Sequence, residues 1–65
     1  MEGVRIMRNK KGMTQRELAN RLCVAQSTVA MWETGENIPR GSTLPAIANE
    51  LGCTIDELFN ADQAS

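Results

Sequence analysis

The chain has 65 residues, contains no histidine or tyrosine, and carries a formal net charge of −1. A chain of this size forms one small core, and the missing histidines exclude Ser-His and Cys-His nucleophile pairs. No apolar stretch approaches the roughly 20 residues that span a bilayer, and Cys23 and Cys53 lack CxxC spacing, which favours reduced thiols. We therefore expect one cytoplasmic domain over residues 1–65 that is not an enzyme and binds no metal, cofactor, membrane or small-molecule ligand.

Charge is distributed unevenly along the chain. Residues 1–21 hold six basic and two acidic side chains, a net +4, whereas residues 22–65 hold one basic and six acidic side chains, a net −5. Because salt limits the reach of an exposed charge to about 8 Å, a nucleic acid would sense the local balance. The overall charge therefore does not exclude a DNA partner, although Lys10 and Lys11 could be no more than a solvated helix end.

Threonines and glycines mark the predicted helix boundaries. Thr14 and Thr54 each precede a glutamate by three residues, the capping-box pattern that starts a helix. Gly12, Gly35 and Gly52 each follow an amphipathic stretch, where glycine commonly ends a helix in the left-handed conformation. The pattern predicts helices, in chain order, at residues 3–11, 15–22, 26–34, 44–51 and 55–60, followed by a frayed tail at 61–65.

The fourth predicted helix has a less obvious start. Pro45 lacks a backbone N–H and is tolerated in the first helical turn, so a cap from Ser42 or Thr43 is expected before it. No segment alternates apolar and polar residues for long enough to predict a strand. The predicted fold class is therefore all-α.

Three residues separate the second and third predicted helices, and a connection this short is typical of a helix-turn-helix motif. Residues 14–35 read TQRELANRLCVAQSTVAMWETG. This segment resembles the TQxxLAxxxxVxxxxVxxxExG pattern of the lambda-repressor/Cro-like (XRE) family of DNA-binding proteins. The resemblance covers about residues 4–60 and includes Arg8, Gly12 and the Ile38-Pro39 pair. It implies a compact five-helix, lambda-repressor-like domain.

The resemblance also implies a repressor/Cro-like transcriptional regulator that binds double-stranded DNA. In this family the third helix, here residues 26–34, lies in the major groove of a palindromic operator, and two copies bind half-sites about one turn apart. A homodimer would be formed through residues 39–41, including Pro39 and Arg40, and through Leu58 or Phe59. Phe59 could instead only close the core of a single copy.

Four residues match the family's base-reading positions or lie beside them: Gln26, Ser27, Met31 and, near a base edge or the backbone, Thr28. The Gln26 carboxamide can pair with adenine N6 and N7, whereas the Ser27 hydroxyl tolerates several bases. Met31 could touch a thymine methyl group. The alternatives are a surface glutamine without a partner and a methionine that fills an irregular gap.

A second set of residues is polar or basic and is expected to contact phosphates: Gln15, Arg16, Asn37, Arg40, Ser42 and Thr43, with Lys10 and Lys11 adding to the same field. Gln15 could instead be a neutral surface position. Arg8 and Glu33 match a structural ion pair of the family.

Two positions depart from the family pattern. Cys23 occupies a turn position where glycine is common, at a cost of about 1–2 kcal/mol if the backbone is left-handed. Ala25 replaces the serine or threonine that usually caps the third helix. A protein-interaction module or antitoxin of the same fold, with little or no DNA reading, is the alternative function, favoured by the net charge and by Ser27 and Met31.

Overall fold

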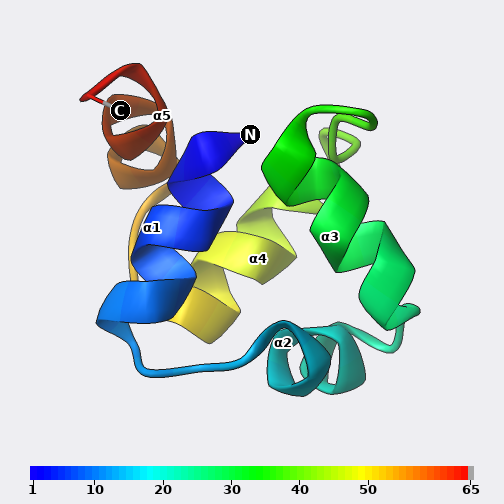
Figure 1. The fold of residues 1–65 in the computed structure, drawn as a ribbon. Coiled ribbons are helices and arrows are strands. Elements are labelled where there is room, and N and C mark those ends of the chain that lie inside the picture. The colour runs from blue at the N-terminus through cyan, green and yellow to red at the C-terminus, as the bar shows by residue number, and fades with distance from the viewer. Residues whose placement is uncertain (65) are drawn as a thin grey trace.

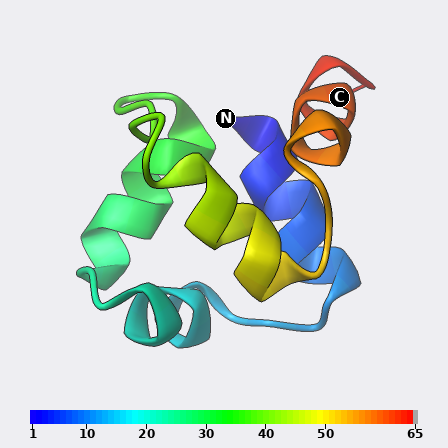
Figure 2. The same cartoon turned by 180° about the vertical axis from the view of Figure 1, so that it is seen from behind.

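The computed structural model describes residues 1–64, which form five helices and no strand. The helices are α1 (Glu2–Lys10), α2 (Gln15–Leu22), α3 (Gln26–Thr34), α4 (Leu44–Leu51) and α5 (Ile55–Ala64). In Figures 1 and 2, α1 and α5 lie side by side on one flank, α3 forms the opposite flank, α2 runs along the bottom, and α4 lies between the flanks. The all-α prediction is confirmed. No helix within these residues has the length and apolar character needed to cross a membrane.

The predicted boundaries of α2, α3 and α4 are confirmed, whereas the prediction of a frayed tail from residue 61 is wrong. Helix α5 continues to Ala64 because its second half packs along the start of α1. There the backbone N–H of Gly3 donates to Oδ1 of Asp62 at 3.2 Å. Ser65 lies outside the described residues.

The core takes one completely buried large side chain from each helix. Val4, Leu18, Val29, Ile47 and Leu58 come from α1 to α5 in that order, and each has no exposed surface. Because every helix supplies one of these side chains, loss of any helix would open the same core to water.

Helix α1 approaches α5 closely at Gly3. A Cβ atom added to Gly3 would lie 2.1 Å from the carbonyl oxygen of Leu58 and 3.0 Å from the backbone nitrogen of Asp62. Any side chain at this position would therefore push the two helices apart.

Both predicted capping boxes are confirmed. At α2 the hydroxyl of Thr14 accepts from the Glu17 N–H at 3.1 Å, and the Glu17 carboxylate accepts from the Thr14 N–H at 3.1 Å. Thr54 and Glu57 make the same exchange at α5, at 3.0 and 2.9 Å. The predicted glycine stops are also confirmed, since all three of those glycines have positive φ.

The start of α4 differs from the prediction. Thr43 precedes the helix with helical backbone angles and makes no side-chain cap in the described part of the chain, and Ser42 does not occupy the cap position. The Arg40 carbonyl instead accepts from the N–H groups of Thr43 and Leu44, at 2.8 and 3.1 Å. A backbone turn thus replaces the expected side-chain cap.

Candidate nucleic-acid interface

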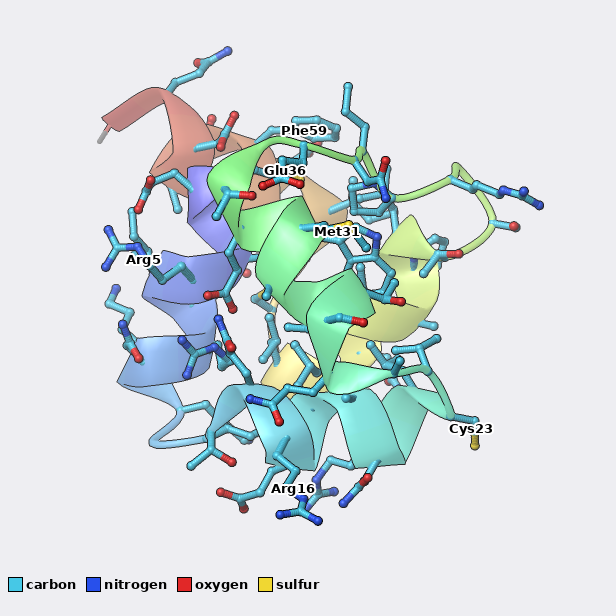
Figure 3. The ribbon with its side chains drawn as sticks, turned by 45° about the vertical axis from the view of Figure 1, so that its right-hand side comes forward. Arg5, Arg16, Cys23, Met31, Glu36 and Phe59 are labelled. Atoms are coloured by element: carbon cyan, nitrogen blue, oxygen red, sulfur yellow. The ribbon has the colours of Figure 1, made fainter. Side chains whose placement is uncertain are left out.

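Helices α2 and α3 meet through a tight turn that begins at Cys23. The Cys23 backbone is left-handed, with φ 58° and ψ 41°, and the next residue, Val24, donates its N–H to the Ala19 carbonyl at 3.0 Å. The Cys23 side chain points away from the protein (Figure 3). The turn therefore keeps the glycine-type conformation despite the cysteine, at a cost of about 1–2 kcal/mol.

Helix α3 divides its side chains between the core and an outer face. Val29, Trp32 and Glu33 are buried, whereas Gln26 and Ser27 in the first turn are exposed. Thr28 and Met31 are half-buried, and Figure 3 shows Met31 midway along the helix. Ala25 precedes α3, and its methyl side chain cannot cap the helix. Two predicted base readers therefore lie fully open at an uncapped helix start.

The carboxylate of Glu33 ties three helices together beneath this face. Arg8 of α1 donates from Nε to Oε2 at 2.6 Å and from Nη2 to Oε1 at 3.2 Å. The same guanidinium donates to the carbonyl of Met13 at 2.6 Å. Because Glu33 is only 7% exposed, this two-point contact compensates a charge that is largely removed from water.

Gln15 joins this network. Its Nε2 donates to Oε1 of Glu33 at 3.0 Å, and the residue is half-buried. A carboxamide has two N–H donors, so this contact leaves Gln15 a second N–H to direct outward. The sequence offered no signal for the contact because Gln15 and Glu33 are 18 residues apart.

The loop between α3 and α4 brings several predicted site residues to one pocket. Two helical residues, Thr28 and Trp32, line it together with four residues of the loop: Asn37, Ile38, Arg40 and Thr43. The pocket therefore brings together one predicted base reader, Thr28, and three residues predicted to contact phosphate, Asn37, Arg40 and Thr43. Ser42 is exposed on the same loop.

Other predicted phosphate contacts do not join this pocket. Arg16 is exposed and points away from α3 (Figure 3). Lys10 is exposed at the last residue of α1. The ammonium of Lys11 lies beside Gly52, 3.2 Å from the position of an added Cβ, at the carboxyl end of α4. That end of a helix favours a cation, which accounts for the position of Lys11 away from the pocket.

Two residues predicted for a dimer contact are corrected by their burial. Pro39 is buried, and Leu58 has no exposed surface, so each serves the core of one copy. Arg40 is exposed. Phe59 is 44% exposed and lines a groove with Ile38, which is 80% exposed and which the sequence did not single out for this role. The same groove is lined by three acidic residues, Glu2, Glu33 and Asp62.

The family assignment rests on residues 4–58, which match the helix-turn-helix family model. The chain belongs to this family. It is 32% identical over 62 residues to the HTH-type transcriptional activator BcrR of Enterococcus faecalis, covering 95% of this chain and 30% of that protein. It is 36% identical over 62 residues to the HTH-type transcriptional regulator DicA of Escherichia coli (strain K12), covering 95% of this chain and 46% of that protein.

The chain therefore spans less than half the length of these two relatives. No solved structure matches it significantly. Membership of the helix-turn-helix family agrees with the α2–turn–α3 geometry described above.

Proposed function

We propose that this protein is a transcriptional regulator that binds double-stranded DNA sequence-specifically, as a homodimer on a palindromic operator. The observation that carries the proposal is the open start of α3. There two polar side chains, Gln26 and Ser27, stand exposed in a family whose members include transcriptional regulators. The start of α3 would enter the major groove.

The base-reading roles follow from the chemistry of the exposed groups. Gln26 presents a donor and an acceptor that suit adenine, and Ser27 accommodates several bases directly or through water. Met31 follows Ser27 by four residues and so shares its helix face, where it would touch a thymine methyl group. Thr28 would lie at a base edge or at the backbone.

The phosphate contacts would surround the same helix. Around the pocket, Arg40 supplies a charge, and Thr43 supplies a neutral donor. The further candidates are Gln15, Arg16, Ser42 and Lys10. With about five to eight such contacts in each copy, binding would weaken steeply as salt is raised.

A homodimer follows from the small size of one module, which buries only about 600–1,000 Å² on DNA. The groove that contains Ile38 and Phe59 offers the apolar surface for a second copy. An Ile38→Ser/Phe59→Ser variant should sediment as a monomer. It should lose far more affinity for a duplex with two half-sites than for a duplex with one.

The main test is a mobility-shift assay with the DNA upstream of the protein's own gene at increasing salt, followed by in vitro selection of bound sequences. Gln26→Ala should abolish the preference for adenine at one position of each half-site. Gln63→Ala, a matched change at an exposed position of α5, should leave every preference unchanged. If no duplex is retarded even at low salt, the proposal is refuted.

A protein-interaction module of the same fold is the second candidate. The exposure of Ile38 and Phe59 favours it, because large apolar side chains gathered at one groove commonly mark a protein contact. This function predicts that the wild-type protein does not bind DNA while the groove still binds a partner.

A further inference from the structure

Met31 is a poor base reader unless something restrains it. A methionine side chain is unbranched and has three rotatable bonds, so a free one would fit several bases equally well. In the structure Met31 is half-buried, and its sulfur accepts a hydrogen bond from Nδ2 of Asn37 at 3.5 Å. The Met31 side chain therefore has a partner that limits its rotation.

The backbone brings Asn37 to this position. The Met31 carbonyl accepts from the N–H of Gly35 at 3.0 Å and from the N–H of Asn37 at 3.2 Å. The left-handed conformation of Gly35, with φ 89°, turns the chain back over the last turn of α3. Because the backbone of Asn37 is already bonded to Met31, the contact between their side chains requires little further ordering.

We infer that Asn37 is a positioning residue for sequence reading: its carboxamide holds the Met31 thioether in one orientation, so that Asn37 sets a base preference without touching a base. This inference rests on the proposed function. It assigns Asn37 a different task from the phosphate contact expected from the sequence, because its amide nitrogen is directed at sulfur within the protein.

The test compares the bases selected by four proteins: wild type, Asn37→Leu, Met31→Ala and the double variant. Leucine keeps the approximate size of asparagine but cannot donate a hydrogen bond. Asn37→Leu should reduce preference by about twofold, the lower end for one hydrogen bond because a thioether is a weak acceptor, and only at the base pair that Met31→Ala also affects. In the Met31→Ala background it should have no further effect on preference. Asn60→Leu, at an exposed position of α5, is the matched control.

Two selection outcomes would overturn the inference while leaving DNA binding intact. One is a uniform loss of affinity for all sequences in Asn37→Leu, with a shallower salt dependence, as a lost phosphate contact would produce. The other is a Met31→Ala protein whose preferences are unchanged while Gln26→Ala still alters them. Failure of the wild type to bind any duplex would refute the proposed function and this inference together.

A measurement without DNA gives independent evidence. In protein with ¹³C-labelled methionine methyl groups, Asn37→Leu should move the Met31 methyl signal toward its unfolded-chain position. The signals of Met7 and Met13, which pack in or against the core, should stay in place and report an intact fold. An unchanged Met31 signal would contradict the inference.

Discussion

Four helix starts of this protein fall into two groups, and the remaining helix, α1, packs against α5 and has no side-chain cap at Met1 in the described part of the chain. Helices α2 and α5 begin with capping boxes, in which Thr14 and Thr54 accept from their own first turns. Helices α3 and α4 begin at Ala25 and Thr43, neither of which supplies a side-chain cap within residues 1–63. The N–H groups of an uncapped first turn remain available to water or to a ligand.

Of α3, α4 and α5, it is α5, the helix away from the proposed interface, that begins with a side-chain cap. The capped helix α5 packs on α1, whereas α3 and α4 flank the loop that carries the proposed DNA contacts. A side-chain cap typically adds about 1 kcal/mol to stability, and its absence at α3 leaves a positive helix end that suits phosphate. At α4 the Arg40 carbonyl already accepts from the N–H of Leu44. Four predictions test these assignments.

Glu33→Ala should have the largest effect, because Glu33 joins the scaffold to the interface through Arg8. Removing one partner of a buried ion pair costs about 3–5 kcal/mol, which urea denaturation would measure. Base preference should be unchanged in the protein that remains folded. Glu36→Ala, at an exposed position, is the control and should change stability by less than about 0.5 kcal/mol. An altered base preference with little loss of stability would assign Glu33 to the interface instead.

Gly3→Ala should destabilise the scaffold by about 1–3 kcal/mol, because the new methyl group would overlap the Leu58 carbonyl. Gly41→Ala is the matched control, since a Cβ there meets nothing within 4 Å. Thermal unfolding of both variants measures the difference. Equal losses would mean that α1 and α5 do not pack as closely as described.

Substitutions can remove the side-chain cap of α5 and add one to α3. Thr54→Ala should remove about 1 kcal/mol by opening the start of α5, whereas Ala25→Ser should add up to about 1 kcal/mol by capping α3. Chemical denaturation resolves both changes. If Ala25→Ser gives no gain in stability, the first-turn N–H groups of α3 already have partners that a serine cap cannot improve on.

The smallest expected effect is a pH dependence at the start of α2. The hydrogen bonds from the backbone N–H and hydroxyl of Thr14 lower the pKa of Glu17 below its ordinary value of 4.5. A carboxylate with a lowered pKa stabilises the fold above 4.5, and this contribution is lost as the pH falls through the folded-state pKa. The Tm of the wild type should therefore fall more between pH 5 and pH 3, roughly the titration range of carboxylates, than that of Glu17→Gln. If the Tm of the wild type and that of Glu17→Gln fall equally over this pH range, the ionised Glu17 carboxylate does not stabilise the fold.

Local interactions made much of the fold predictable. The capping box at Thr14 and the stops at Gly35 and Gly52 involve residues within a few positions of one another, so the start of α2 and the ends of α3 and α4 could be read from the sequence. The exposure of Gln26 and Ser27 follows from the same periodicity, once Val29 and Trp32 point inward. The family pattern added the expectation that this outer face binds DNA.

The remaining features depend on contacts between distant parts of the chain. The length of α5 is coupled to a hydrogen bond between residues 59 positions apart, and the contact of Gln15 with Glu33 spans 18 positions. Helix bounds set by signals within one turn, such as the start of α2 and the ends of α3 and α4, could be predicted, whereas the end of α5 could not, because it depends on packing against α1. The burial of Pro39 and Leu58 emerged only in the packed molecule, because it depends on what the other helices cover.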